Sequence, residues 1–185
     1  MAVETTNAKI TAPGAPELAA SIQNHISITP IRLDDTWGLD HGTWSILTRL
    51  YPQADIPVIQ MSLDTHLSPE KHWALGQELS FLREEGVLIL GSGNIVHHLG
   101  LIRWGGAPYS WATAFDATIK QCLQTQQTAT LLSYRHLEHA DLAAPTNEHF
   151  LPLLYAYGAS RGETPQFFNE SIFASSLSMT SVLFG

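Results

Sequence analysis

The sequence has 185 residues and 44% of them are hydrophobic, so we expect residues 1–185 to form a single domain with a buried core. Nine Lys and Arg against 17 Asp and Glu give a net charge of -8, which argues against nucleic acid or an anionic membrane as a partner. A single cysteine, Cys122, excludes an internal disulfide. No apolar run reaches membrane-spanning length and no secretory signal opens the sequence, so we expect a cytoplasmic protein.

Histidine is the unusual component, because the nine histidines equal all Lys and Arg together. No HExxH, HxH or CxxC spacing joins them, so any metal site has to be assembled from distant segments. The histidines are His25, His41, His66, His72, His97, His98, His136, His139 and His149.

The amino-terminal third predicts two helices. Residues 1–12 are polar and unpatterned. Apolar residues at helical spacing then predict a short helix from about Pro16 to Asn24. A second helix is expected after Asp40, which suits the N-cap, with apolar residues every three or four positions up to Leu50.

The middle of the sequence predicts a strand, a helix and a second strand. Ile56–Leu63 and Val87–Leu90 are apolar runs typical of strands buried on both faces, and we expect Val87–Leu90 to be central. Between them, Ser68 followed by Pro69 signals the start of a helix, and Gly86 signals its end. This order predicts one right-handed crossover unit.

The carboxyl-terminal half predicts further helices and a closing strand. One helix is expected with Ser110 as its cap and Cys122 on its apolar side, and a shorter one is expected over residues 128–137. Another is expected with Thr146 as its cap and His149 in its first turn. The last residues, SIFASSLSMTSVLFG, alternate apolar and small polar side chains as a strand does. We expect Cys122 to be a packing residue, since no cationic neighbour is evident.

Three histidines stand at element boundaries, beside a glycine or a cap: His41, His97 and His149. His97 follows a Gly-Ser-Gly loop at the end of the expected strand Val87–Leu90, which is where α/β proteins place polar site residues. The loop alone is weak evidence, because it lacks the GxGxxG spacing of a dinucleotide site. For each of the three, a functional role and a structural role both remain open on these grounds.

Four segments together resemble a known family. They are GSGNIVHHL, WGLDHGTW with LYPQADIPVIQMSLD, NEHFLPLLYAYGA and SLSMTSVLFG. In this combination the sequence resembles the class III extradiol ring-cleavage dioxygenases, specifically the subunit-B-like group that contains the 4,5-DOPA dioxygenases, from about Thr11 to Gly185. The resemblance implies an α/β fold with a central mixed, mostly parallel sheet flanked by helices.

The resemblance also implies a function. Members of this family are non-haem Fe(II) enzymes, zinc-loaded in some preparations, that open a DOPA-like catechol with O₂ as co-substrate. By resemblance, His97 is the acid/base, His149 is a metal ligand and His41 binds substrate. An imidazole, which titrates near pH ~6.5 in water, is a suitable acceptor for the second catechol proton. His98 stands where close relatives often have asparagine.

The sequence departs from the family at its amino end. The relatives carry a G-H-G-S-P-like and an A-H-W-like motif, whose two histidines complete the metal triad, and neither motif occurs here. We therefore expect an incomplete domain without the first strands of the family, whose exposed sheet edge favours self-association. Three interpretations stay open: a truncated dioxygenase whose intact form is active, a chain whose partner supplies the missing ligands, and an inactive relative that acts as a binding module. A zinc-dependent hydrolase is a more remote fourth.

Overall fold

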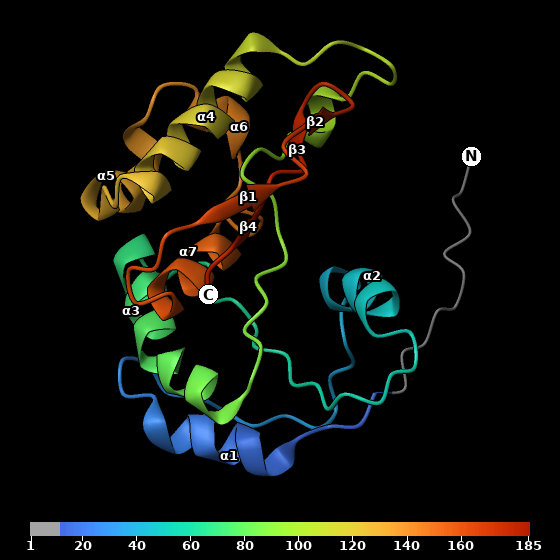
Figure 1. The fold of residues 1–185 in the computed structure, drawn as a ribbon, viewed down its shortest axis with the longest axis vertical. Coiled ribbons are helices and arrows are strands. Elements are labelled where there is room, and N and C mark those ends of the chain that lie inside the picture. The colour runs from blue at the N-terminus through green and yellow to red at the C-terminus, as the bar shows by residue number, and fades with distance from the viewer. Residues whose placement is uncertain (1–11) are drawn as a thin grey trace. The chain divides into compact units, whose positions relative to one another are not determined.

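The structure is a computed structural model that describes residues 12–185, shown in Figure 1. Its residues divide into two compact units, one extending to Ser62 and one from Leu63 to Gly185. The irregular amino end expected over residues 1–12 lies, as far as residue 11, outside the described residues. The single domain expected over residues 1–185 stays a prediction.

The first unit contains two helices at the predicted places, α1 (Pro16–His25) and α2 (His41–Leu50). The Asp40 carboxylate caps α2 by accepting a hydrogen bond from the backbone N–H of Thr43 at 2.9 Å. Gln60 Oε1 braces the same helix end, since it accepts from the backbone N–H of Asp40 and from the Thr43 hydroxyl. The start of α2, where His41 lies, is therefore held by two side chains.

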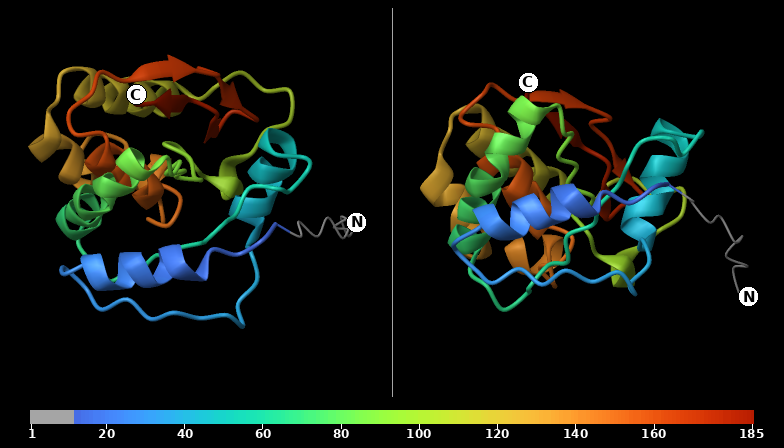
Figure 2. Two further views of the ribbon diagram at one scale, coloured as in Figure 1. Left: turned by 60° about the horizontal axis from the view of Figure 1, so that its bottom comes forward. Right: turned by 90° about the horizontal axis from the view of Figure 1, so that it is seen from below.

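The second unit is mostly helical, and its longer helices begin close to where the sequence predicts them (Figure 1). The views in Figure 2 show α3 beside α7, and the last residues of the chain run close to α4. The helices are α3 (Pro69–Leu79), α4 (Ser110–Gln124), α5 (Thr128–Leu132), α6 (Ala140–Ala143) and α7 (Leu151–Ala159), with 3-10 turns η1 (Ser80–Glu85), η2 (Leu99–Leu101) and η3 (Tyr134–His136).

The carboxyl-terminal segment forms short antiparallel ribbons instead of one closing strand. The strands are β1 (Gln166–Phe168), β2 (Ile172–Phe173), β3 (Leu177–Ser178) and β4 (Ser181–Leu183), and they pair as β1 with β4 and β2 with β3. Ala174 and Ser175 lie between β2 and β3 with positive φ angles of 47° and 71°. These two residues turn the chain back on itself, which an alternating pattern does not reveal.

The two strands predicted at Ile56–Leu63 and Val87–Leu90 are wrong: in the part of the chain that the structure describes, neither segment is assigned as a strand. The mostly parallel central sheet is likewise not found among the described strands, whose two pairings are antiparallel. A strand needs a neighbouring backbone to accept and donate its ladder of hydrogen bonds. Leu88 is 59% exposed and Leu90 40%, so this segment is not buried on both faces either.

The core of the second unit is formed by side chains of α4, α5, α6 and α7. Phe150 is fully buried and stacks on Tyr134 with ring centroids 3.9 Å apart, while Phe115 of α4 meets it edge-on. Cys122 is buried in the same cluster, and burial raises the pKa of its thiol. The packing role predicted for Cys122 is confirmed.

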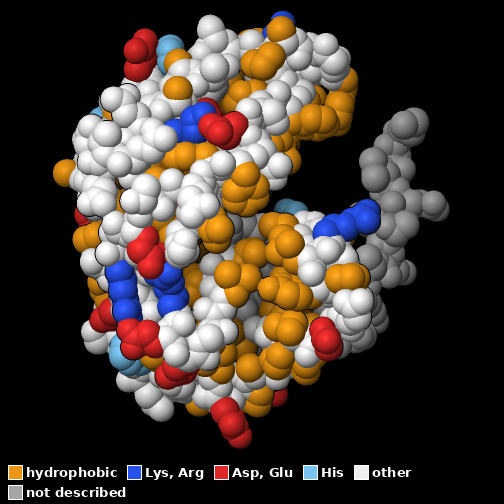
Figure 3. Space-filling view, in the orientation of Figure 1, with side chains coloured by type: hydrophobic (Ala, Val, Ile, Leu, Met, Phe, Trp, Pro, Cys, Tyr) orange, Lys and Arg blue, Asp and Glu red, His pale blue; other side chains and the backbone are white. Residues whose placement is uncertain are grey.

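Charged side chains of both signs mix on the surface. Figure 3 shows Lys and Arg side chains beside Asp and Glu side chains on the viewed face. In the second unit, Arg83 pairs with Glu163 at 2.7 Å and Arg161 pairs with Glu84 at 2.5 Å. Among the described residues, no helix has the length and apolar character needed to cross a membrane.

Helices α3 and α7 approach each other closely at a glycine. A Cβ atom on Gly76 of α3 would overlap the main-chain carbonyl oxygen of Tyr155 in α7, a contact that real side chains do not make. The two backbones therefore pack together only because position 76 has no side chain.

Gly76→Ala is expected to lower the free energy of unfolding by about 1–3 kcal/mol, because the new methyl group forces α3 and α7 apart. Urea denaturation measures this change. Gly38→Ala is the matched control, since nothing lies within 4 Å of a Cβ at that position. Equal stability of the Gly76 variant and the parent would show that the helices are free to separate.

His72 of α3 is buried, with no exposed surface, and its Nδ1 forms a 2.9 Å hydrogen bond with the Tyr155 hydroxyl. Burial lowers the pKa of His72, and interactions with Asp64 and Leu67 oppose this only in part. Burial also raises the pKa of Tyr155 to about 12, so both groups stay neutral near pH 7. His72 therefore has a structural role, in the packing of α3 against α7.

The neutral His72 predicts a pH dependence of stability. In the unfolded chain the ring takes up a proton near pH ~6.5, whereas the folded ring does so only at lower pH, so stability falls as the pH drops below that value, by at most about 1.4 kcal/mol per pH unit. Urea denaturation between pH 7 and 5 should show a shallower fall for His72→Asn than for the parent. The same substitution at exposed His136 should keep the parent slope. An unchanged slope in His72→Asn would contradict this account.

Candidate functional site

The loop at residues 91–98 lies against the turn that precedes α7. The backbone N–H of Asn94 donates to the His149 carbonyl oxygen at 2.8 Å. A Cβ atom on Gly93 would overlap that same oxygen, so the main chains meet only because position 93 is glycine. The Gly-Ser-Gly sequence thus serves a close approach of two backbones.

The contact brings His97 and His149 together. Their rings stack with centroids 3.5 Å apart and planes 12° from parallel, and both side chains are half-buried. The backbone N–H of His97 donates to the carbonyl oxygen of Ala143 at 2.7 Å, and His97 also bridges to Leu177 of β3. Two of the three histidines selected from the sequence are therefore neighbours.

The sequence predicted His149 in the first turn of a helix, and this prediction is wrong. His149 lies in the turn that precedes α7. The backbone N–H groups of Phe150 and Leu151 both donate to the carbonyl oxygen of Asn147, which closes this turn. Thr146 is not the cap of the helix, because its hydroxyl donates to Glu148 Oε1 at 2.7 Å. The helix begins at Leu151, with Pro152 in the first turn, where its missing N–H is not needed.

His41 belongs to the first unit, where it is the exposed first residue of α2. The expected substrate-binding role of His41 stays a prediction.

A carboxylate stands near the histidine pair. Burial by itself raises the pKa of Glu148, but the hydrogen bond from Thr146 and the charges of His149 and His97 outweigh it, so the pKa of Glu148 is lowered. Glu148 therefore carries a negative charge near the two imidazoles at neutral pH.

The described residues do not contain a complete metal site. Within residues 12–185, no group of three or more His, Cys, Asp or Glu side chains is arranged to hold a metal ion. Non-haem Fe(II) sites commonly use three protein ligands, so the pair of His97 and His149 does not suffice.

His98, the neighbour of the acid/base candidate, is held by the carboxyl-terminal segment. Its backbone N–H donates to the Ser176 carbonyl oxygen at 3.2 Å, and the Ser176 hydroxyl donates to the His98 carbonyl oxygen at 2.9 Å. Its ring lies 6.3 Å from the ring of Trp111, centroid to centroid. The His98 backbone is thus held by two hydrogen bonds to Ser176.

Sequence reasoning missed three residues that support the loop. Asn94 Nδ2 donates to the Ser178 carbonyl oxygen at 2.7 Å, and the backbone N–H of Ser178 donates to the carbonyl oxygen of Val96 at 2.9 Å. The Ser178 hydroxyl donates to Asp116 of α4. One signal was available, because Asp116 stands between Phe115 and Ile119 on the apolar side of its helix.

The chain is similar to known proteins along most of its length. Residues 3–185 match the family described as the catalytic LigB subunit of aromatic ring-opening dioxygenase. The chain is 41% identical over 181 residues to a protein of Escherichia coli named 4,5-DOPA dioxygenase extradiol, covering 94% of the chain and 67% of that relative. It is 40% identical over 161 residues to a protein of the same name from Beta vulgaris, covering 82% of the chain and 59% of that relative.

A solved structure has a similar fold. An uncharacterised protein from Escherichia coli K12 superimposes with a TM-score of 0.91 at 40% identity, over 98% of this chain and 77% of that chain. This likeness confirms the predicted α/β fold class, even though the described strands are short. The chain spans about three fifths to two thirds of the length of the curated relatives named above. On these matches, the chain belongs to the LigB family of extradiol ring-cleavage dioxygenases.

Proposed function

We propose that this chain supplies the acid/base part of an extradiol dioxygenase that opens the ring of a DOPA-like catechol with O₂. The observation that carries this proposal is the stacked pair of His97 and His149, formed by the two histidines that the family resemblance selects. The two relatives named 4,5-DOPA dioxygenase extradiol support the catechol as substrate.

In this proposal His97 handles the protons. Its imidazole accepts a proton from a catechol hydroxyl, and it returns a proton to oxygen as the ring opens. The ring is half-buried and its backbone is hydrogen-bonded to Ala143, so it is held for this transfer without being closed off from a substrate. Nearby Glu148 stabilises the imidazolium formed after the first transfer.

His149 is proposed as one ligand of a metal ion, Fe(II) or Zn²⁺. Its imidazole is of a ligand type that both metals accept. The described residues do not supply the further ligands, so they do not fit a complete site. Holding the ion therefore requires further ligands in addition to His149, from outside the described residues.

The same observation favours a second candidate function. In this second candidate, the chain is a catalytically inactive relative that acts as a binding module, or one that needs a partner chain for its metal ligands, and the lack of a three-ligand group among the described residues supports it. Metal binding by the purified 185-residue chain separates these candidates from a self-sufficient enzyme. Tight binding of one Fe(II) with cleavage of a catechol by the chain alone would contradict both.

A chimaera tests the role of His97. The Escherichia coli relative would keep its own residues outside the matched region and receive residues 12–185 of this chain. We expect this protein to bind metal, consume O₂ and form a yellow product from DOPA. His97→Ala should abolish ring cleavage with metal content unchanged, because a base that is not a ligand has been removed.

His149→Ala should instead lose the metal together with the activity. The control is His139→Ala, a histidine outside the pair, which should retain both. A chimaera that folds and binds metal but cleaves no catechol would overturn the proposed function. Loss of metal in His97→Ala would make His97 a ligand.

His41 is proposed to bind substrate. In the same chimaera, His41→Ala should raise KM for DOPA about tenfold with kcat nearly unchanged, which is the pattern of a lost binding interaction that is made equally in the ground and transition states. His25→Ala, on α1 of the same unit, is the control. Parent kinetics for the His41 variant would leave that residue with a structural role only.

A further inference from the structure

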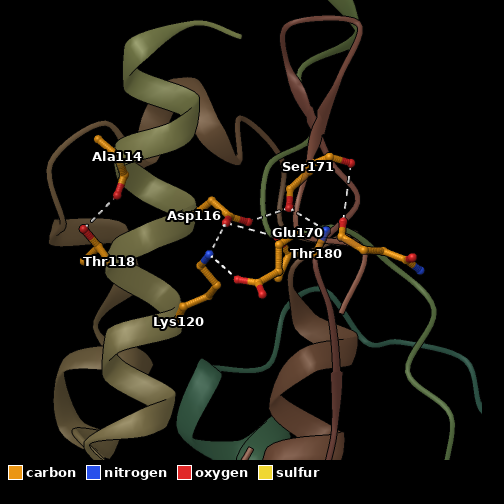
Figure 4. Close-up of polar contacts among 9 residues, drawn as sticks. Ala114, Asp116, Thr118, Lys120, Glu170, Ser171 and Thr180 are labelled. Atoms are coloured by element: carbon orange, nitrogen blue, oxygen red, sulfur yellow. Dashed lines mark hydrogen bonds and ion pairs between the residues drawn. The ribbon is translucent and has the colours of Figure 1, made fainter. Parts of the chain in front are cut away.

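A buried carboxylate lies on α4, close to the carboxyl-terminal strands. Asp116 is only 6% exposed, and hydroxyl groups donate to both of its oxygens: Ser178 to Oδ1 at 2.5 Å and Thr180 to Oδ2 at 3.1 Å. Lys120, one turn further along α4, places Nζ 3.6 Å from Oδ2 (Figure 4). Burying a carboxylate is costly unless it is paired and hydrogen-bonded, and here it is both.

Lys120 is itself held in place. Its ammonium group forms an ion pair with Glu170 at 2.8 Å, and this hydrogen bond raises the pKa of Lys120, helped by the charge of Asp116 (Figure 4). The positive charge therefore persists at neutral pH, and Asp116 has a constant cationic neighbour.

Ser178 connects this carboxylate to the loop that carries His97. Its side chain donates to Asp116, while its main chain bonds the loop twice, through N–H to the Val96 carbonyl and through C=O to the Asn94 amide. Asn94 then donates its own N–H to His149. These four hydrogen bonds thus link α4 through Ser178 to Val96, the residue before His97, and through Asn94 to the main chain of His149.

We propose that Asp116 is a positioning residue, which fixes Ser178 and through it the stacked arrangement of His97 and His149. The Asp116 oxygen sets the place of Ser178, and the two main-chain bonds of Ser178 set the place of residues 94–96. The catalytic part of this role rests on the proposed function, whereas the structural part does not.

The alternative role for Asp116 is a general anchor, which holds α4 to the carboxyl-terminal strands without positioning the loop. An anchor would stabilise the whole unit, so its loss would loosen α4 and the core together. A positioning residue acts locally, on the loop residues 94–96 to which Ser178 is hydrogen-bonded. The two roles therefore differ in where the effect of a substitution appears.

Hydrogen exchange and NMR of the 185-residue chain distinguish the two roles. In Ser178→Ala and Asp116→Asn, the amides of Ser178 and His97 should exchange about tenfold faster, as expected for a lost hydrogen bond to a charged group. Amides of α3 and α7 should exchange at the parent rate. The Cε1–H signals of His97 and His149, shifted by their stacked rings, should move toward the positions of free histidine.

Two variants serve as controls. Glu170→Gln removes the ion pair of Lys120 without touching Ser178, and Thr118→Val removes a hydroxyl of α4 that donates only to Ala114 within the helix (Figure 4). Both should leave the exchange of the His97 amide and the ring signals unchanged. If Asp116→Asn does not fold, Ser178→Ala carries the test, because it leaves the carboxylate and the main-chain bonds in place.

The outcomes separate this role from the proposed function. Parent exchange rates and ring signals in a folded Ser178→Ala would overturn the positioning role, whatever the activity. So would faster exchange throughout the second unit, which is the sign of a general anchor. In the chimaera, Ser178→Ala should lower kcat about tenfold with KM for DOPA unchanged. An inactive chimaera would defeat the proposed function, while the exchange and ring signals would still decide the role of Asp116.

Discussion

The site depends on one main-chain contact, the hydrogen bond from Asn94 to the carbonyl oxygen of His149. It requires two backbones to approach so closely that position 93 tolerates no side chain. This contact fixes the loop at residues 91–98 relative to the turn before α7, and the imidazoles of His97 and His149 stack. The arrangement of the pair therefore depends on this close backbone packing.

Sequence reasoning succeeded where the determinants of structure are local. The start of α2 was predictable because the Asp40 side chain bonds a residue three positions away, and the start of α3 because Pro69 suits a first helical turn. The strand prediction for Val87–Leu90 failed because a strand is defined by its partners. Its composition fits a doubly buried strand, yet Leu88 is 59% exposed, so no local property of these four residues decides their state.

For the site, the sequence was informative about His97 and His149 through their motifs, and uninformative about what holds them. Asp116 lies on the buried side of α4 with Ile119, so in the sequence its position resembles that of a core residue. Its proposed role is visible only in the folded structure, where Ser178, 62 residues later in the sequence, donates a hydrogen bond to it. Polar groups within an apolar helix face are the signal that sequence reasoning can use, because burial obliges each of them to find partners.

The two proposed roles, proton transfer by His97 and metal binding through His149, have different structural requirements. The arrangement of His97 is set by α4, β3, the loop and the turn before α7, all of which belong to the second unit and are present. A complete metal site needs ligands that the described residues do not provide. The orientation of His97, the proposed acid/base, is thus supported by contacts within the second unit. Membership of the family, carried by likeness along the whole chain, can therefore persist where the activity does not, because the packing that keeps the fold is the same packing that keeps the histidine pair.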